Sequence, residues 1–497
     1  MSTIDTEKKE TVNIVSDDQS DVTSLNTENV ITPTVRDAVA IDVEKAPQYE
    51  VKNHKKLEMI TSKIVTPSIA VLLTLFLAII VILYGVFYLG CLWDPISKLK
   101  NVPVAILNQD NGFDFTGYPI EVQQKLLGFT NNQTLGELIS GSFFNENSPF
   151  HSTLKWESIE SNVNANDLND RVGLGDYWAA IIIPSNFSNA FLSNLENKTS
   201  HHINPNAFNM TIQFTYDQAR QFTVVSIITR AVQTIMDNVS YTFGSKLVSQ
   251  AEKSPNGHLD LIVVPEFLLK PIWLIHNNIH PVNHYGHNFS TYVGAIVLWL
   301  GGMIVTTLLF KIYQSRFIYL HPQIHQPRFK IRYLISSAFM VIFFSFVSSV
   351  IFFGTLSVLN GSNTPFIVGN STSMDYILFG WLFTLTSSLF CCIFANLMGV
   401  DNYSMIPSIF LIMQLATSNA ILDPIVMDKL TYVSDAFPLT YAVKGFRCLT
   451  FGTQCHKMGS YVGVLFIWVG VTGVLNLFLA YRQITKRVID AKVAEAL

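Results

Sequence analysis

Four histidines in the stretch "IHNNIHPVNHYGH" have the residue type and the closeness in sequence that a zinc site needs. They are His276, His280, His284 and His287. On an unbroken helix the first three would share one face, but Pro281 interrupts that helix. No acidic residue or cysteine is close in the sequence to complete the ligands. We therefore expect polar packing at a membrane rim and no metal site, with zinc binding as the alternative.

The sequence carries none of the motifs that nucleotide-driven or hydrolytic enzymes need. No "GxxxxGK[ST]" phosphate loop occurs, and "GLGD" at 173–176 precedes a strand instead of opening a helix. "GxSxG" and "HExxH" are also absent. Asp110 in "NQDNG" could begin a calcium loop, but the ligand spacing beyond it is missing, so we expect a plain turn. We predict that the protein is not an enzyme and holds no cofactor.

The segment "FPLTYAVKGFRCLTFG" at 437–452 combines an apolar face with two cations. Pro438 suits the first turn of a helix. The apolar residues that then recur on one face are Leu439, Ala442, Val443, Phe446 and Leu449. Lys444 and Arg447 fall toward the other side. A short amphipathic helix of this kind is suited to lie at a membrane interface, and a plain surface helix is the alternative.

Cysteines offer one candidate cross-link. Five cysteines are too few to staple a whole fold. Cys448 and Cys455 lie seven residues apart in a predicted outer loop, where an oxidising compartment permits a disulfide without requiring it. Cys391 and Cys392 lie in a predicted membrane helix and are expected to be inert packing residues.

Strongly polar residues are few in the predicted membrane helices. They are Asn396, Gln414, Asn419 and Asn476, with Asp401 at one boundary. Amides in lipid usually face other helices, so we expect hydrogen bonds between helices, with substrate contact as the alternative. No carboxylate lies near the centre of a predicted helix, which argues against a proton-coupled pump.

The elements that hold these residues are mainly membrane helices. Of 497 residues, 49 % are hydrophobic and only 14 % are charged, against about 25 % charged in soluble domains. No charged residue occurs from Ile64 to Trp93, a run longer than the roughly 20 residues that cross a bilayer. Further apolar runs occur at about 291–310, 333–359, 376–400, 404–422 and 460–481. We therefore predict a membrane all-α bundle of about six helices, one followed by five.

Basic residues predict the orientation of these helices. They gather before the first apolar run, in the connection between the second and third runs, and after the sixth. The three groups are Lys52, Lys55, Lys56 and Lys63, then Lys311, Arg316, Arg328, Lys330 and Arg332, and finally Arg482, Lys486, Arg487 and Lys492. All fall on one side, so the N- and C-termini are predicted to be cytosolic, with the first helix as an uncleaved signal anchor. The basic connection between the second and third apolar runs is also where a cytosolic partner would bind. No nucleic-acid partner is expected.

Glycosylation acceptors agree with this topology. Asn-X-Ser/Thr triplets on the predicted outer side begin at Asn132, Asn186, Asn197, Asn209, Asn238, Asn360 and Asn370, and at Asn288 close to the membrane. Asn402 is the exception, on the predicted inner side. This distribution predicts a multi-pass protein that reaches the plasma membrane through the secretory pathway.

The polar segment between the first two apolar runs is long enough to form its own core. Short apolar runs ended by turn residues predict strands at 102–108 and 177–184, and alternation predicts one at 209–218. Ser185 or Asn186 is available to cap a following helix. A longer helix is predicted over 219–251 from an apolar stripe of Val225, Ile228, Val232, Ile235 and Val239. The segment is therefore expected to be an α+β domain outside the membrane.

These patterns divide the chain into five parts. The parts are a disordered cytosolic tail at 1–60, the first membrane helix at 61–93, the outer α+β domain at 94–290, a five-helix membrane domain at 291–481 and a cytosolic tail at 482–497.

Four stretches, in this order along the chain, resemble one group of membrane proteins. They are "WDPISKLKNVPVAILNQDNG" (93–112), "GDYWAAIIIPSNFSNAF" (175–191), "NHYGHNFSTYVGAIVLWLGGM" (283–303) and "FPLTYAVKGFRCLTFG" (437–452). They are similar to segments of phage-infection proteins and ABC type-2 exporter permeases, and together they resemble the fungal nitrosoguanidine-resistance membrane proteins. The resemblance covers about residues 60–490 and implies a permease-like body with a large domain between its first two helices.

The resemblance implies a function in toxicant resistance, through transport or redistribution of amphipathic compounds or membrane lipids. In the related permeases the equivalent of 437–452 closes the outer end of the bundle, so we expect this segment to gate access. Lys444 and Arg447 are then candidate contacts for a lipid or substrate headgroup, and Arg447→Ala is expected to preserve folding while reducing resistance. Because the chain lacks a phosphate loop, a separate ATPase would supply the energy. The alternative is a non-transporting regulator or scaffold whose outer domain binds partners.

Overall fold

A computed structural model describes most of the chain outside the N-terminal tail. The described residues are 67–90, 94–118, 120–196, 210–252, 270–314, 328–360, 365–418, 421–427 and 429–496. The chain divides into two compact units, Met1–Leu75 and Phe76–Leu497. The predicted tail at 1–60, the acceptors Asn197 and Asn209, and Arg316 and Asn419 lie outside the described residues.

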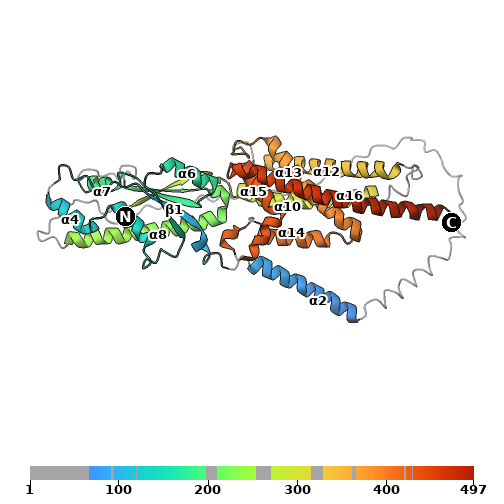
Figure 1. The fold of residues 1–497 in the computed structure, drawn as a ribbon, viewed down its shortest axis with the longest axis horizontal. Coiled ribbons are helices and arrows are strands. Elements are labelled where there is room, and N and C mark those ends of the chain that lie inside the picture. Colours follow the sequence, from blue (N-terminus) through green and yellow to red (C-terminus); the bar gives the residue numbers. More distant parts are fainter. Residues whose placement is uncertain are drawn as a thin grey trace, which may run out of the picture. The chain divides into compact units, whose positions relative to one another are not determined.

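A five-stranded mixed sheet forms the centre of the predicted outer domain (Figure 1). The strands are β1 (Pro103–Asn108), β2 (Lys155–Ile159), β3 (Ala179–Ile183), β4 (Thr211–Tyr216) and β5 (Trp273–Asn278), in the order β2-β1-β3-β4-β5. β1 pairs in parallel with β2 and β3, β4 pairs in parallel with β5, and β3 and β4 are antiparallel. The three predicted strands are present, and β2 and β5 are additional.

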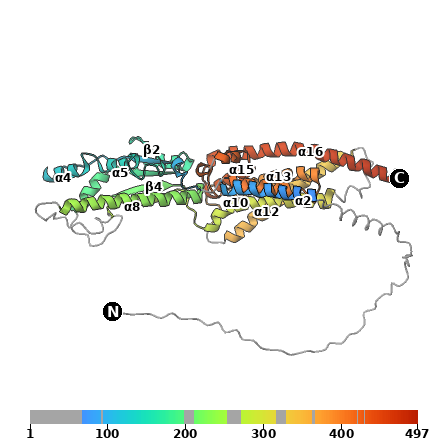
Figure 2. The same ribbon diagram turned by 90° about the horizontal axis from the view of Figure 1, so that it is seen from below.

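Helices cover both faces of this sheet. Successive side chains of β1 point to opposite faces, so this strand contributes to the core on each side. Val104 and Ile106 belong to the larger core with the helices of one face, whereas Ala105 and Leu107 belong to a second cluster with Leu168 of α6. The helices are α4 (Ile120–Thr130), α5 (Leu135–Phe144), α6 (Ala165–Leu174), α7 (Phe187–Glu196) and α8 (Phe222–Glu252). The predicted apolar stripe of α8 is buried in the larger core, which confirms that interpretation. Figure 2 shows α8 running beside β4.

Four of the described helices are long and apolar enough to cross a membrane. They are α10 (Tyr285–Leu308), which continues as the π-helix η5 (Leu309–Gln314), α12 (Phe329–Asn360), α13 (Ser373–Met398) and α16 (Met458–Ala496). The chain is therefore a membrane helical protein with a smaller mixed-sheet domain. The predicted first apolar run is helical as α2 (Pro67–Tyr84), followed by the π-helix η2 (Gly85–Leu89).

The predicted crossing at 404–422 needs correction. Its described helix, α14, spans only Met405–Thr417, which is 13 residues. At 1.5 Å per residue such a helix is about 20 Å long, shorter than the roughly 30 Å hydrocarbon core. The described helix is therefore shorter than a single crossing requires, and residues 419 and 420 lie outside the described residues.

Small polar residues let α10 and α13 approach closely. Ser387 Oγ donates to the carbonyl of Trp299 at 2.8 Å, and Thr306 Oγ1 donates to the carbonyl of Ser388 at 3.1 Å. A Cβ atom at Gly302 would lie 2.9 Å from the backbone nitrogen of Ser388, so no larger residue fits there without movement. Such small residues allow tight packing of helices in lipid, where hydrophobicity gives no drive for association.

The expected hydrogen bonds between amides and other helices are present where the structure describes them. Asn396 Nδ2 of α13 donates to Asn476 Oδ1 of α16 at 2.6 Å. Gln414 Oε1 of α14 accepts from the backbone nitrogen of Leu439 at 3.1 Å. Leu439 lies in α15 (Pro438–Phe451), so this amide satisfies a donor at the start of a neighbouring helix.

Candidate functional site

The structure brings polar residues from the sheet domain and the helical part together at a buried junction. We call Asp217, Arg220, His280, Arg447 and Thr453 the seam. Asp217 and Arg220 follow β4, and His280 follows β5. Arg447 lies in α15, and Thr453 lies between α15 and α16. The hydrogen bond between Thr453 and Asp217 joins residues that are 236 positions apart in the sequence, so the seam forms only when the whole chain has folded.

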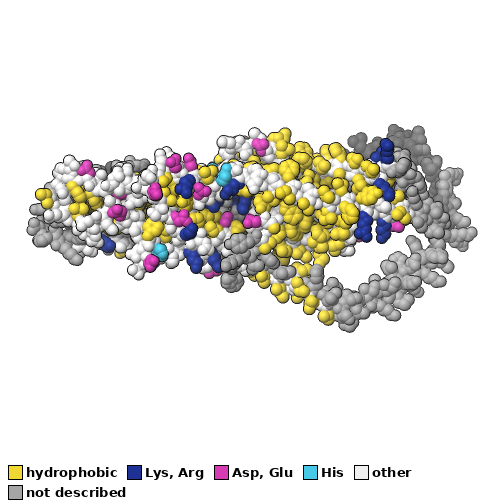
Figure 3. All heavy atoms as spheres, viewed as in Figure 1, with side chains coloured by type: hydrophobic (Ala, Val, Ile, Leu, Met, Phe, Trp, Pro, Cys, Tyr) yellow, Lys and Arg dark blue, Asp and Glu magenta, His cyan; other side chains and the backbone are white. Residues whose placement is uncertain are grey.

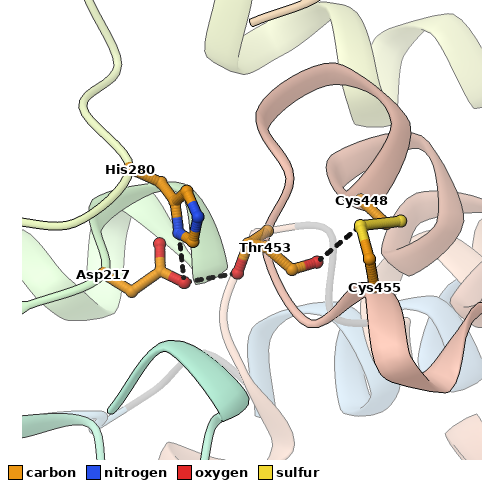
Figure 4. The surroundings of a disulfide bond; sticks show 5 residues. All are labelled: Asp217, His280, Cys448, Thr453 and Cys455. Carbon is orange, nitrogen blue, oxygen red and sulfur yellow. Dashed lines mark hydrogen bonds and ion pairs between the residues drawn. A yellow bond between two sulfur atoms is a disulfide. The ribbon is translucent and has the colours of Figure 1, made fainter. Parts of the chain in front are cut away.

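Asp217 is the acceptor at the centre of the seam, and its side chain is completely buried. It caps the short 3-10 helix η4 (Gln218–Arg220) by accepting from the backbone nitrogen of Arg220 at 3.2 Å. Its second carboxylate oxygen accepts from Thr453 Oγ1 and lies 3.1 Å from Nδ1 of His280 (Figure 4). A buried carboxylate needs such partners because burial removes its hydration.

Arg220 lies over an aromatic ring at the start of β3. Its guanidinium carbon is 4.0 Å from the centroid of the Trp178 ring, and Nη1 donates to the carbonyl of Tyr177 at 2.8 Å. Burial lowers the pKa of Arg220, while the charges of Asp423 and Asp217 act in the opposite direction. The stacking and the two carboxylates compensate for part of the lost hydration.

The helix α15, which carries Arg447, is buried, whereas the sequence predicted a helix at a membrane interface or on the protein surface. Almost every residue of α15 is buried, and Arg447 itself is only 4 % exposed. Its Nη1 donates to the carbonyl of Arg220 at 2.9 Å. Burial lowers the pKa of Arg447, and the charges of Asp423 and Asp217 oppose this change. In this conformation Arg447 binds the sheet domain instead of facing a lipid headgroup.

Lys444, the second candidate contact of the gate, is less enclosed than Arg447 and is partly exposed. Burial lowers its pKa, and the charges of Asp423 and Asp435 raise it. Lys444 therefore faces the same acidic surroundings as Arg447 but keeps access to water. The proposed contact with a headgroup stays a prediction for this residue.

The chain between α14 and α15 adds an apolar connection beside the seam. Leu422, Val426 and Met427 are buried in the same core cluster as β1, β3 and α8. Val426 lies in the 3-10 helix η6 (Pro424–Val426), which Asp423 caps through the backbone nitrogen of Ile425 at 3.0 Å. The sheet domain and the helical part thus share apolar packing as well as hydrogen bonds.

The predicted disulfide joins Cys448 and Cys455 (Figure 4). It closes the turn that carries Thr453 from the end of α15 to the short 3-10 helix η8 (Cys455–Lys457). Within this turn Gly452 has φ +87°, a conformation that glycine adopts without strain. The disulfide and the turn together place the Thr453 hydroxyl against Asp217.

We expect the Cys448→Ser, Cys455→Ser double variant to lose about 2 kcal/mol of unfolding free energy, because a seven-residue loop is no longer closed in the unfolded chain. The measurement is thermal unfolding of the full chain in detergent, with and without reductant. Reductant should lower the melting temperature of the wild type and leave the double variant unchanged. Equal melting of all four samples would show that the cross-link contributes nothing to stability.

The four histidines do not converge on a metal site. His280 belongs to the seam, His276 lies on β5 with Nε2 3.2 Å from Gln233 Oε1, and His287 lies 2.6 Å from the carbonyl of Phe366. Among the described residues, no three histidine, cysteine or acidic side chains are grouped as metal ligands. The contacts of His276, His280 and His287 are with polar groups of the protein.

Most of the described glycosylation acceptors on the predicted outer side are accessible to solvent. Asn132, Asn186, Asn238 and Asn370 are exposed, and Asn360 is half-buried. Asn132 and Asn186 precede or begin helices of the sheet domain, and Asn238 lies on α8. Modification of these residues stays a prediction.

A groove and a cavity among the described residues lie outside the seam. A surface groove of about 440 Å³ lies between α8 and the β4–β5 edge, with Tyr216, Arg230 and His276 among its lining residues. A smaller cavity of about 170 Å³ lies between η5, α12, α13 and α16 and is mainly apolar. The groove could hold a polar ligand and the cavity an apolar one.

Sequence reasoning found Arg447, His280 and the two cysteines but missed Asp217, Arg220 and Thr453. The available signal was the "YDQAR" stretch, in which Asp217 lies near the end of a predicted strand and Arg220 follows it with no turn-forming glycine or proline. Nothing local in that stretch indicates a partner in α15.

The comparisons with known proteins give one match. A family model described as a protein of unknown function (DUF3533) matches residues 71–474. No curated protein and no solved structure matches the chain. The matched range includes the sheet domain, α10, α12 to α15 and every residue of the seam.

Proposed function

We propose that this chain, which belongs to the DUF3533 family, is a permease-like protein that moves or redistributes amphipathic compounds or lipids across the plasma membrane. Through this activity it contributes to toxicant resistance. Its similarity to the nitrosoguanidine-resistance proteins supports the proposal, as do its apolar helices. A separate ATPase that binds the basic connection near residues 311–332 supplies the energy, and the N- and C-termini are cytosolic.

The seam is the observation that carries this proposal. Arg447 and Thr453 attach α15 and its following turn to Arg220 and Asp217 of the sheet domain. The opposite side of α15 packs in the core of the helices, where a Cβ at Gly445 would collide with the ring of Phe379 in α13. A helix fixed at both sides transmits a shift of α13 to the sheet domain, which is what a gate at the outer end of a bundle requires.

The decisive experiment is reconstitution of the purified full chain in liposomes that contain a fluorescent phospholipid. Movement between leaflets is followed by dithionite quenching, with and without cytosolic ATPase fractions. Thr453→Val removes the hydroxyl that donates to Asp217 with little change in shape. Thr242→Val is the matched control, because Thr242 is an exposed residue of α8 whose hydroxyl donates within its own helix.

We expect the wild type and Thr242→Val to accelerate lipid movement and Thr453→Val to be slower at equal protein content. Movement no faster than in protein-free liposomes, under both conditions, would contradict transport. Equal rates for wild type and Thr453→Val would contradict the role of the seam. Resistance of cells that express each variant at the same surface level gives a second readout.

The surface groove favours a second candidate function, that of a non-transporting receptor or scaffold. Its lining combines the aromatic ring of Tyr216 with Arg230, Gln233 and His276, which suits a polar ligand with a negative charge. Retained resistance in an Arg230→Gln variant, together with lipid movement by the wild type, would favour the permease. Lost resistance without lipid movement would favour the receptor.

A further inference from the structure

An apolar cavity is formed among the membrane helices near the end of the bundle that carries the C-terminus. Its volume is about 170 Å³. Its lining includes Leu334 and Ala338 of α12, Leu389 of α13, and Gly473 and Leu477 of α16. An apolar cavity of about 150 Å³ can hold benzene, so this one has room for several carbons of an acyl chain.

Three polar side chains line the cavity, those of Ser337, Cys392 and Asn476, and the last two have partners. Asn476 Oδ1 accepts from Asn396 Nδ2 at 2.6 Å, and the Cys392 sulfur lies 3.6 Å from Thr306 Oγ1. These contacts leave the cavity with a mainly hydrocarbon lining. Its preferred occupant is therefore an alkyl group.

A basic surface lies directly beyond this cavity. Lys330 precedes the lining residue Leu334 by four positions, about one helical turn, on α12. Its Nζ lies 5.8 Å from the ring of Tyr481, which follows the lining residue Ala480 on α16. Lys330 is thus at the end of the cavity where α12 and α16 meet.

Other cations surround Lys330 at this end of the helices. Figure 3 shows Lys and Arg side chains gathered where the hydrophobic surface of the bundle ends. Among the described side chains the cations there are Lys311, Arg328, Lys330, Arg332, Arg482, Lys486 and Arg487, and they outnumber the acids Asp401 and Asp490. The combination of an apolar cavity and a cationic rim matches a molecule with an alkyl chain and an anionic head.

We propose that this cavity and its basic rim bind one anionic phospholipid, with a segment of acyl chain among η5, α12, α13 and α16 and the phosphate beside Lys330. The positive-inside rule predicts that this is the cytosolic end, so the lipid belongs to the inner leaflet. The site does not depend on the proposed transport, because a protein that moves nothing can still hold a lipid.

Gly473 offers a direct way to fill the cavity. A Cβ at this position would meet no atom closer than 3.8 Å, the Cδ1 atom of Leu389. The side chain in Gly473→Leu can therefore extend into the space that the acyl chain is proposed to occupy. Gly470→Leu is the matched control, because Gly470 lies one turn earlier on α16, is exposed, and has no atom within 4 Å of a Cβ.

The test uses the full chain in nanodiscs of phosphatidylcholine and titrates fluorescent phosphatidylserine, with fluorescent phosphatidylcholine as the neutral probe. We expect preference for phosphatidylserine, loss of saturable binding in Gly473→Leu and unchanged binding in Gly470→Leu. Lys330→Gln should weaken phosphatidylserine binding about five-fold, since one cation near an anionic lipid has about that effect.

Each result decides a separate part of the proposal. Equal binding of the two probes would overturn the choice of an anionic lipid. Wild-type binding by Gly473→Leu, with its thermal unfolding unchanged, would overturn the acyl-chain site. If Gly473→Leu is unfolded, the Lys330→Gln titration decides alone, because Lys330 is a partly exposed residue outside the packed core; wild-type affinity in that variant would then overturn the site.

Discussion

Arg447→Ala should lower the unfolding free energy by about 3 kcal/mol or more, whereas a gate contact at the membrane surface predicts that folding is preserved. The guanidinium is 4 % exposed and donates to the carbonyl of Arg220 at 2.9 Å. Its removal leaves that carbonyl without this donor, opens a cavity in the seam and takes a positive charge away from Asp217 and Asp423. Breaking one side of a buried charged contact costs more than the contact contributed, because its partner stays buried.

The measurement is chemical or thermal unfolding of the full chain in detergent, with the surface level in cells as a second readout. Lys457→Ala is the matched control, since it also removes a cation near the seam but from an exposed position in η8. The control should change stability by less than about 0.5 kcal/mol. If Arg447→Ala and Lys457→Ala unfold at the same temperature, Arg447 does not stabilise the junction.

This expected instability changes how a loss of resistance is interpreted. A low resistance in Arg447→Ala cells could follow from a low amount of folded protein, and does not by itself identify a gate. Thr453→Val is the better probe of coupling because it removes only the donor to Asp217. A loss of lipid movement in that variant at normal stability is what a gate would produce.

The local pattern of apolar residues was enough to predict the strands and helices whose buried residues form a continuous run or recur at regular steps. β1 and β3 are buried on both faces, so their sequences "PVAILN" and "AAIII" are continuous apolar runs. α8 shows its buried stripe at steps of three and four residues. β2 and β5 were missed because "KWESI" and "WLIHNN" lie at the two edges of the sheet, where polar side chains are tolerated.

Long-range polar contacts were beyond the reach of local pattern. An amphipathic wheel of α15 places Arg447 opposite the apolar stripe, which normally means water or a membrane surface. In the structure that side faces Arg220 and the buried Asp217 instead. Periodicity reports which residues share a face, but it does not report whether another domain covers that face.

The turn "NQDNG" shows the same limit, and it leads to the second large effect. Its Asp110 does more than form the expected turn. One carboxylate oxygen accepts from the backbone nitrogen of Ser188 at 3.0 Å and the other from that of Gly136 at 2.9 Å. Gly136 and Ser188 lie in the first turns of α5 and α7, so one carboxylate binds the N-termini of two helices.

Asp110→Ala should therefore destabilise the sheet domain by about 3 kcal/mol, since hydrogen bonds to a charged acceptor are worth about 1.5–3 kcal/mol each and are not additive. The Ser188 hydroxyl, which donates to the same carboxylate at 2.5 Å and is fully buried, would also lose this acceptor. Asp110→Asn should be intermediate, because an amide keeps one oxygen but adds a donor and loses the charge that favours helix N-termini.

Hydrogen exchange of the full chain in detergent locates this effect as well as measuring it. Faster exchange is expected in α5 and α7, with little change in α13, which makes no contact with Asp110 through these bonds. Asp114→Ala is the control, because Asp114 is an exposed carboxylate four residues away whose partner Thr116 is local. Unchanged exchange in α5 and α7 of Asp110→Ala would contradict the argument that this carboxylate holds the two helices. Phe187 and Phe191 of α7 are buried in the larger core of the sheet domain. If α7 detaches when the Asp110 carboxylate is removed, both rings become exposed, so a single side chain in a turn controls the burial of this part of the core.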